Sequence, residues 1–487
     1  MKWALYNILF ALVYPFLLPG FLLRMLRRGG YAARMGDRFA LYPEGLFGAN
    51  RPLFDSHATV PGASSRRGAG KDRAAPATRR RVGYGDFVWI HAVSVGEVQV
   101  AGQLMREWRK VDPGVRFCFS TTSSTGWKIA EKELSTLNSQ LSTPSDVLIY
   151  NPLDFPNFVK SALRTVRPRA IVLTESEIWP NFILQAKKMG IPLFLINARV
   201  SDRSAPRYKA AKWFFGDVLS SFTRIFAQSE LDKARLVAAG APAERVDVTG
   251  SFKFDVAHCN EAKERELKAW IFGDGDVTEV RTKILLGGST WPGEDEVLLK
   301  IYRRLLTASV QQQVAAPKLV IAPRHFEKAD AVEANIRKAG FGCVRRSRNQ
   351  TIEQSEQSEQ SNNVYLADTT GELMGLYGIA DVVFVGKSLC AHGSQNMIEP
   401  CLCGKPTFVG PYTENFRPVM SDLLAADAIV QVKDADELEE KVLRCLGGLE
   451  GLEGLEGLEG LGERARAAVA RRCGVVAKCV AAIRSAL

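Results

Sequence analysis

Short apolar runs alternate with amphipathic stretches along this chain, and that alternation constrains the fold more than any other feature. The apolar runs at residues 87–93, 116–121 and 170–173 predict strands, and the stretch at 98–110 predicts a helix between the first two. Strands that alternate with helices favour a parallel sheet covered on both faces. The pattern begins again at residues 283–286. We therefore predict two doubly wound α/β domains facing one cleft, with ligand at the carboxyl ends of the strands.

The length of the chain and the interruptions of this pattern indicate where the domains begin and end. With 487 residues, the chain exceeds what one hydrophobic core usually serves. We expect the first domain over residues 29–256 and the second over 282–487, joined by a linker at 257–281 that carries no strand pattern. Residues 51–82 are rich in Gly, Pro, Ser, Ala and Arg, and predict either a disordered basic insert or a solvated linker.

The N-terminal segment, residues 1–28, is predicted to be a membrane-anchor helix. Residues 3–23 are apolar apart from Asn7, which is just long enough for a membrane span. Two prolines interrupt the segment, so a helix lying in the membrane interface fits nearly as well. A cleaved signal peptide fits less well, because its positive residues should precede the apolar run, whereas here the arginines follow it. These arginines predict that the body of the protein lies on the cytoplasmic face.

The net charge and the cysteines narrow the class of partner. A formal charge of +11 predicts an anionic partner such as nucleic acid, acidic lipid or a phosphorylated substrate. The sequence shows no interleaved aromatic and basic stripe, which argues against nucleic acid. The nine cysteines are scattered without a CxxC pair, and HExxH and DxD motifs are absent. We therefore predict no metal site and a reducing, cytoplasmic setting.

The stretch "HAVSVGEV", residues 91–98, places Glu97 where a predicted strand is followed by a helix. An acid in the first turn of a helix is stabilised by the helix dipole, and that alone could explain it. Gly96 and the small residues around it leave space beside the carboxylate, however. With little solvent and a second acid nearby, Glu97 could instead act as a general base.

Polar residues also follow later strands of the first domain. Glu175 and Glu177 have side chains on the same face if the strand before them continues. One of them could take part in catalysis while the other pairs with Arg199, or the pair could be purely structural. Lys253 follows Gly250 and could contact a phosphate or carboxylate, although lone lysines are usually solvated.

The strand ends of the second domain carry a different set of polar residues. Arg324 directly follows an apolar strand, where its guanidinium group can bind a phosphate. Glu372 and Asn396 stand at the start of probable helices, whose N–H groups are free to bind anions. Glu399 lies three residues after Asn396, so both can face one ligand, with the acid accepting from ribose hydroxyls. These features predict a nucleotide site, and the absence of GxxxxGK[ST] excludes a P-loop.

Taken together, the motifs of both domains resemble those of the 3-deoxy-D-manno-octulosonic acid (Kdo) transferase family. In order they are "HAVSVGE", "TESEIWPN", "NARVSDRS", "AQSELDKARLVAAGA", "VTGSFKFD", "APRH", "DTTGEL", "NMIEP" and "GPYTENF". The resemblance covers nearly the whole chain outside its low-complexity inserts. It implies the GT-B architecture and inverting transfer of Kdo from CMP-Kdo to the lipid A precursor (lipid IVA), at the cytoplasmic face of the inner membrane. It implies no cofactor and no bound metal.

The resemblance also implies roles for particular residues. Glu97 matches the family's proton acceptor, and Glu175 and Lys253 match its proposed transition-state stabilisers. The residues that match its CMP contacts are Pro323, Arg324, Thr370, Gly371, Glu372, Asn396, Met397, Ile398 and Glu399. On the donor side the chain departs from the family pattern, with Trp291 in place of a histidine, Thr370 in place of a methionine and Lys387 in place of a glycine.

Two other functions remain open. One is a GT-B enzyme that uses a UDP-sugar, and the other is a non-catalytic, basic protein that holds anionic lipid at a membrane surface. The motifs do not determine how many Kdo residues are transferred, their linkage or the oligomeric state.

Overall fold

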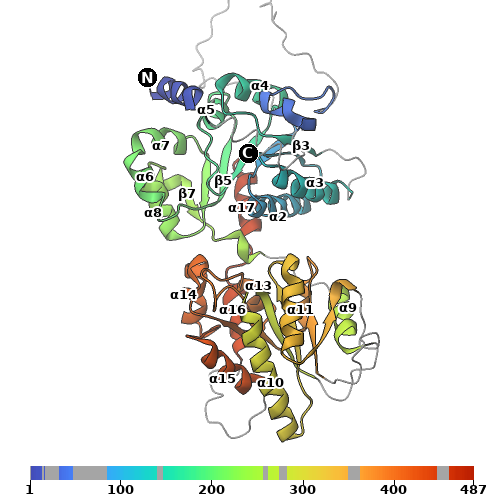
Figure 1. The fold of residues 1–487 in the computed structure, drawn as a ribbon. Coiled ribbons are helices and arrows are strands. Elements are labelled where there is room, and N and C mark those ends of the chain that lie inside the picture. The colour runs from blue at the N-terminus through green and yellow to red at the C-terminus, as the bar shows by residue number, and fades with distance from the viewer. Residues whose placement is uncertain are drawn as a thin grey trace, which may run out of the picture. The chain divides into compact units, whose positions relative to one another are not determined.

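The chain divides into two compact units, each built around one sheet (Figure 1). The first unit comprises Met1–Phe252 and Gly474–Leu487, and the second comprises Lys253–Cys473. The computed structural model describes residues 2–13, 16, 32–47, 85–139, 146–255, 261–273, 282–348, 362–446 and 460–487. The predicted insert at 51–82 lies outside the described residues.

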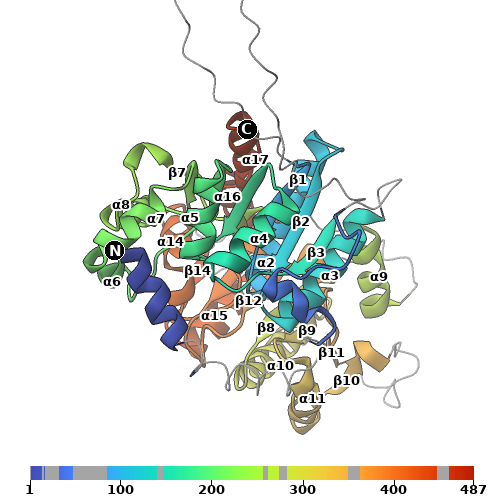
Figure 2. The ribbon, with the colours of Figure 1, turned by 90° about the horizontal axis from the view of Figure 1, so that it is seen from above.

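In its described residues, the first unit holds a seven-stranded parallel sheet with the order β3-β2-β1-β4-β5-β6-β7 (Figure 2). Its strands are β1 (Phe87–His91), β2 (Arg116–Thr121), β3 (Val147–Tyr150), β4 (Ala170–Thr174), β5 (Leu193–Ala198), β6 (Arg224–Ala227) and β7 (Val246–Val248). Its helices are α2 (Val95–Val111), α3 (Ser124–Asn138), α4 (Pro156–Val166), α5 (Pro180–Lys188), α6 (Ala205–Ala210), α7 (Lys212–Leu219), α8 (Glu230–Ala238) and α17 (Val475–Ser485).

Both faces of this sheet are buried, which explains why its strands are continuous apolar runs. On β1, Trp89 packs into the core on one face, whereas Val88 and Ile90 pack into the core on the other. The prediction of a doubly wound α/β domain is confirmed for this unit.

The C-terminal helix α17 corrects the predicted boundary of the second domain, 282–487. Val475, Cys479, Val480 and Ile483 are buried in the core of the first unit, together with residues of α2. The apolar stripe of a helix shows that one face is buried, but it does not show which sheet covers that face. For this reason the sequence alone assigned α17 to the wrong domain.

The second unit, in its described residues, also holds a seven-stranded parallel sheet, with the order β10-β11-β9-β8-β12-β13-β14. Its strands are β8 (Ile284–Thr290), β9 (Lys318–Pro323), β10 (Gly342–Arg345), β11 (Asn363–Leu366), β12 (Val382–Val385), β13 (Thr407–Val409) and β14 (Val430–Gln431). Its helices are α9 (Glu261–Phe272), α10 (Glu294–Gln312), α11 (Ala329–Lys338), α12 (Leu373–Ile379), α13 (Ile398–Leu402), α14 (Arg417–Ala425), α15 (Ala435–Leu446) and α16 (Leu461–Ala470).

Helix α9 corrects the predicted linker at 257–281. Leu267, Trp270 and Ile271 are buried in the core of the second unit, and α9 packs against α12 of that unit. Within this segment, Glu261–Phe272 carry no strand pattern because they form a helix, and the three buried apolar residues make that helix part of the domain rather than a hinge.

The N-terminal residues 2–13 form a helix that packs on the first unit (Figures 1 and 2). The rings of Trp3 and Tyr6 lie 4.9 and 5.6 Å from the ring of Phe214 on α7, and the Tyr6 hydroxyl donates to Asp154 Oδ2 at 3.0 Å. Among the described residues, no helix has both the length and the apolar character needed to span a membrane. The membrane-anchor helix at 1–28 therefore stays a prediction, and most of its second half lies outside the described residues.

Candidate active site

The candidate catalytic acids of the first unit lie at the point where the strand order of its sheet reverses. The chain runs outward from β1 through β2 to β3, then returns to β4 on the other side of β1. Glu97 follows β1, whereas Glu175 and Glu177 follow β4. Because all strands are parallel, the segments after β1 and β4 meet at one edge, where α/β sheets bind ligands.

Glu97 is fixed through one of its two carboxyl oxygens. Its Oε2 accepts from the backbone N–H of Val93 at 2.9 Å and lies 3.3 Å from Thr174 Oγ1, so it joins the ends of β1 and β4. Its Oε1 contacts the hydroxyl of Ser94 at 2.9 Å, and Ser94 is exposed. Glu97 itself is 8% exposed. The helix-dipole interpretation is therefore incomplete, since this acid also connects two strands.

The predicted space beside Glu97 is present. A Cβ atom placed on exposed Gly96 would have no heavy atom of the described residues within 4 Å. The chain next to Glu97 therefore leaves open space at Gly96.

Glu175 pairs with Arg199, which was one of the predictions, but its backbone does not continue the strand. Its Oε2 lies 3.5 Å from Nε of Arg199, and its Oε1 accepts from Asn197 Nδ2 at 3.3 Å. The strand does not continue through Glu175, because β4 ends at Thr174 and Glu175 has φ 51°. The expectation that strand alternation places Glu175 and Glu177 on one face is therefore wrong. A left-handed conformation at a non-glycine residue is strained, and such residues cluster at functional sites.

At this edge the pKa of Glu177 is raised to about 7. Burial is the largest cause, followed by the charge of Glu97, with a smaller contribution from Glu175. Its Oε2 accepts from Trp179 Nε1 at 2.9 Å and lies 3.8 Å from Nε2 of the fully buried His91. Sequence reasoning missed His91, although this residue opens the "HAVSVGE" motif.

In the second unit, the strand order reverses between β8 and β12. Arg324 follows β9, Thr370 and Gly371 follow β11, and Asn396 and Glu399 follow β12. Three of the predicted nucleotide-binding segments are thus brought to the carboxyl edge of one sheet. Thr370 and Gly371 are exposed there.

Asn396 and Glu399 contact each other, whereas their spacing predicted only that both can face one ligand. Asn396 Nδ2 donates to Glu399 Oε1 at 2.9 Å, and Asn396 Oδ1 accepts from the N–H of Ile398 at the start of α13. Burial raises the pKa of Glu399, while the Asn396 hydrogen bond and the charge of Arg324 act against that rise. Met397 and Ile398 are fully buried.

The side chain of Glu372 is occupied by ion pairs. It lies 3.1 Å from Arg346 and 2.6 Å from Lys263, and the Thr369 hydroxyl also donates to it. Burial acts to raise the pKa of Glu372, but these three partners outweigh it and lower the pKa to about 2. The predicted contact of Glu372 with CMP stays a prediction, and its side chain already has a structural role.

Glu294 is a buried acid of this edge that sequence reasoning missed. Its carboxylate is fully buried and accepts from the backbone N–H groups of Trp291, Lys387, Ser388 and Leu389 at 2.8 to 3.1 Å. The loop after β12 therefore uses these amides to hold an acid of its own unit. Its place in the first turn of α10 could not single it out, because acids are common at the start of helices.

Two of the departures from the family pattern contact each other. Lys387 Nζ lies 5.0 Å from the ring centroid of Trp291, whose ring lies 5.1 Å from that of His325. Lys253 belongs to the second unit, at its first position, where its Nζ lies 4.8 Å from the ring centroid of Phe416. Glu97 and Glu175, in contrast, belong to the first unit.

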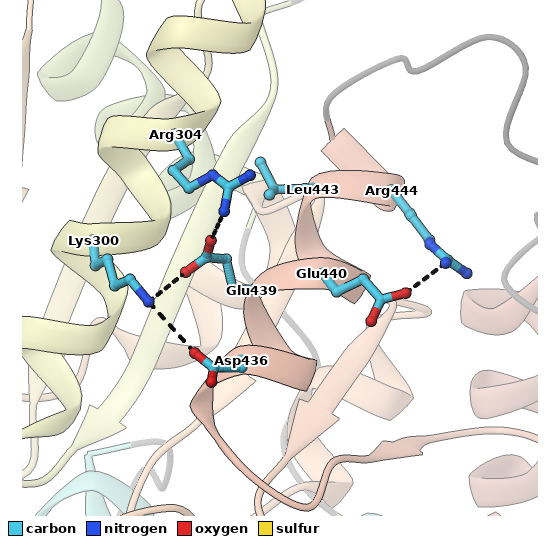
Figure 3. A pocket seen from close by; sticks show the side chains of 7 residues that line it. All are labelled: Lys300, Arg304, Asp436, Glu439, Glu440, Leu443 and Arg444. Atoms are coloured by element: carbon cyan, nitrogen blue, oxygen red, sulfur yellow. Dashed lines mark hydrogen bonds and ion pairs between the residues drawn. The ribbon is translucent and has the colours of Figure 1, made fainter.

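A pocket between α10 and α15 offers no comparable site (Figure 3). Lys300 lies 3.1 Å from Glu439 and 3.4 Å from Asp436, Arg304 also pairs with Glu439, and Arg444 pairs with Glu440. Each cation drawn there already has an acidic partner, so we assign this pocket no ligand.

Two parallel α/β units, each with polar residues where its strand order reverses, define a GT-B-like glycosyltransferase. The fold is similar to that of a glycosyltransferase from Rickettsia africae, with a TM-score of 0.51 and 11% identity over 82% of this chain and 98% of that one. Residues 37–256 match the family model described as 3-deoxy-D-manno-octulosonic-acid transferase (kdotransferase).

Curated relatives place the chain more narrowly. It is 33% identical to the 3-deoxy-D-manno-octulosonic acid transferase of Haemophilus influenzae, over 73% of this chain and 78% of that protein. It is 34% identical to the enzyme of the same name from Bordetella pertussis, over 72% of this chain and 76% of that protein. The chain belongs to the Kdo transferase family and is a glycosyltransferase.

Proposed function

We propose that the protein transfers Kdo from CMP-Kdo to the lipid A precursor (lipid IVA) in lipopolysaccharide biosynthesis, with inversion and with Glu97 as general base. The observation that carries this proposal is the geometry of Glu97. One oxygen is anchored to β1 and β4, and the other faces an exposed serine beside the open position at Gly96.

The reaction needs a group that accepts the proton of the attacking hydroxyl. As an acceptor sugar hydroxyl attacks C2 of Kdo, Oε1 of Glu97 takes its proton and CMP departs from the opposite face. A positioned base of this kind contributes about 10²- to 10⁴-fold. Rotation of the Ser94 hydroxyl is enough to free Oε1, because Oε2 alone holds the carboxyl group to the strands.

Glu175 and Lys253 are assigned to stabilisation of the transition state. The contact with Arg199 and the left-handed backbone hold Glu175 in place. Lys253 supplies a positive charge toward the anionic donor, which carries both a carboxylate and a phosphate.

The second unit is assigned to CMP. Arg324 suits the phosphate, and the pair of Asn396 and Glu399 offers both donors and acceptors to ribose hydroxyls. The exposed loop at Thr370 and Gly371 supplies backbone groups, and the remaining proposed contacts come from Pro323, Glu372, Met397 and Ile398. CMP is a good leaving group, so we propose that transfer needs no metal and no cofactor.

The N-terminal helix supports attachment to the cytoplasmic face of the inner membrane. Its residues Leu5, Ile8, Leu9 and Leu12 are each at least 50% exposed, whereas Trp3 and Tyr6 face the first unit. An apolar stripe with helical spacing suits a helix that lies in the membrane interface. The excess of basic residues favours anionic lipid.

Mass spectrometry of lipid IVA incubated with CMP-Kdo and the purified protein tests this proposal. We expect the mass of lipid IVA to rise by one or more Kdo residues, and UDP-sugars in place of CMP-Kdo to give no product. Transfer from a UDP-sugar would instead support the alternative donor. Absence of transfer from any sugar nucleotide would support the non-catalytic alternative.

A further inference from the structure

The fully buried His91 has its two ring nitrogens in different environments. Its Nδ1 lies 3.1 Å from the backbone carbonyl of Ser120 and 2.9 Å from Ser120 Oγ. A carbonyl oxygen only accepts, whereas the Ser120 hydroxyl can donate or accept. We assign the hydrogen to Nδ1, because only then is its contact with the carbonyl a hydrogen bond. Burial lowers the pKa of His91 to about 4, which keeps the ring neutral at physiological pH. In a neutral ring with Nδ1–H, Nε2 is an acceptor.

That acceptor lacks a donor. Among the residues that the structure describes, Nε2 of His91 has no hydrogen-bond partner, and Glu177 Oε2 lies 3.8 Å away. A buried acceptor without a donor is costly, by about 1–3 kcal/mol. An ionised Glu177 would only add a second acceptor. A protonated Glu177 would supply the missing hydrogen after a shift of about 1 Å toward Nε2.

Two neighbouring acids also favour a proton on Glu177. Glu97 from α2 and Glu175 from the adjacent turn both act to raise its pKa. Tyr208 of α6 faces it as well, since burial and then the charge of Glu177 raise the pKa of that tyrosine. The hydrogen bond from Trp179 acts against the rise in the pKa of Glu177, and the cation Arg199 pairs with Glu175.

We propose that Glu177 is a positioning residue, which holds a proton against Nε2 of His91 and so keeps one carboxyl group of this edge uncharged. The proposal rests on the proposed function, in which Glu97 works as a carboxylate and the donor brings two negative charges. An uncharged Glu177 lowers the repulsion of that donor while leaving Glu97 as the base. Ionisation of Glu177 adds a negative charge beside Glu97 and leaves Nε2 of His91 facing an acceptor. Activity is therefore expected to be present at low pH and lost as the pH rises.

The first experiment follows kcat/KM for CMP-Kdo from pH 5.5 to 9 in the wild type and in Glu177→Gln. In the wild type we expect an alkaline decline with an apparent pKa near 7, about tenfold per pH unit above it. Glu177→Gln cannot ionise and should lose that decline. The matched control is Glu133→Gln, which removes an acid of α3 that pairs with Arg106, and should keep the wild-type profile. A decline in Glu177→Gln with the wild-type pKa would overturn the proposal.

The second experiment needs no donor, so it separates this proposal from the proposed function. The chain has five histidines, and the ¹⁵N signals of His91 can be assigned with a His91→Gln variant. We expect Nδ1 to carry hydrogen, and the Nε2 signal to shift between pH 6 and 8 in the wild type but not in Glu177→Gln, with the midpoint near 7. Hydrogen on Nε2, or an Nε2 signal that does not respond to pH in the wild type, would contradict the proposal even if transfer is observed.

Discussion

The carboxyl edges of the two sheets share a parallel topology, but they shift the pKa of one acid each, Glu177 and Glu372, in opposite directions. In the first unit, burial and neighbouring acids raise the pKa of Glu177 to about 7. In the second unit, Arg346 and Lys263 overcome the effect of burial and lower the pKa of Glu372 to about 2. Glu177 at the first edge can therefore hold and exchange a proton near neutral pH, whereas Glu372 at the second edge stays ionised and paired. The fold is the same, so the chemistry comes from the side chains at each edge.

The largest loss of stability is expected when the buried, fully hydrogen-bonded carboxylate of Glu294 in the second unit is removed. Glu294→Ala leaves the amides of Trp291, Lys387, Ser388 and Leu389 without their acceptor. We expect a loss of about 3 kcal/mol or more in the free energy of unfolding of this unit, because buried unpaired donors are costly. Urea unfolding followed by hydrogen exchange in peptides of each unit measures it.

The matched control for that substitution is Glu296→Ala. Glu296 is an exposed acid in the first turn of the same helix, α10, and its removal should change stability by less than about 0.5 kcal/mol. Equal losses of stability in the two variants would show that the hydrogen bonds of the buried Glu294 carboxylate do not stabilise this edge.

A smaller effect is expected from Arg324→Ala, which tests whether the second edge binds the anionic donor. Loss of a charge-assisted contact with phosphate should raise the KM for CMP-Kdo and lower kcat/KM about 10- to 100-fold. Steady-state kinetics with varied CMP-Kdo would measure this change. Arg303→Ala on α10, which removes an exposed hydrogen bond to the Ala339 carbonyl, serves as the control. An unchanged KM in Arg324→Ala would show that Arg324 does not bind the donor.

The two acids are expected to affect stability in opposite pH windows. The pKa of Glu372 falls from 4.5 to about 2 on folding, so its contribution is present above pH 4.5 and is lost as the pH falls toward 2. The pKa of Glu177 rises from 4.5 to about 7, so its contribution is present below pH 4.5 and is lost as the pH rises to 7. Each should amount to about 1–2 kcal/mol after allowance for solvent screening.

Hydrogen exchange in each unit as a function of pH tests this contrast. Glu372→Gln should flatten the acid dependence of the second unit only, and Glu177→Gln should flatten the neutral dependence of the first unit only. If the stability of both units changed in the same direction with pH, the proposed contrast between Glu177 and Glu372 would be wrong.

The sequence predicted the sheets and the segments at their edges, because those depend on local patterns. The alternation of apolar runs predicted β1 and α2, and with them the position of Glu97 where a strand gives way to a helix. The Glu175–Arg199 pair was one of the alternatives that the sequence offered, whereas the contact of Asn396 with Glu399 was not predicted.

The features that the sequence did not reveal depend on partners far apart in the chain. Glu294 is held by amides 93 to 95 residues away, and His91 faces an acid after β4. Helix α17 packs on the first unit after the whole second unit has intervened. Periodicity shows that such residues are buried or helical, but the partner that buries them is determined only by the tertiary structure.

The most direct test of the account is the rate of Kdo transfer by Glu97→Gln. The account predicts a loss of about 10²- to 10⁴-fold in kcat, with the affinity for CMP within twofold of the wild type and normal hydrogen exchange in β1 and β4. Glu107→Gln, on the same helix and paired with Lys110, should transfer at the wild-type rate. If Glu97→Gln retained more than a tenth of the wild-type kcat, Glu97 would not be the base and the assignment of the first edge would be wrong.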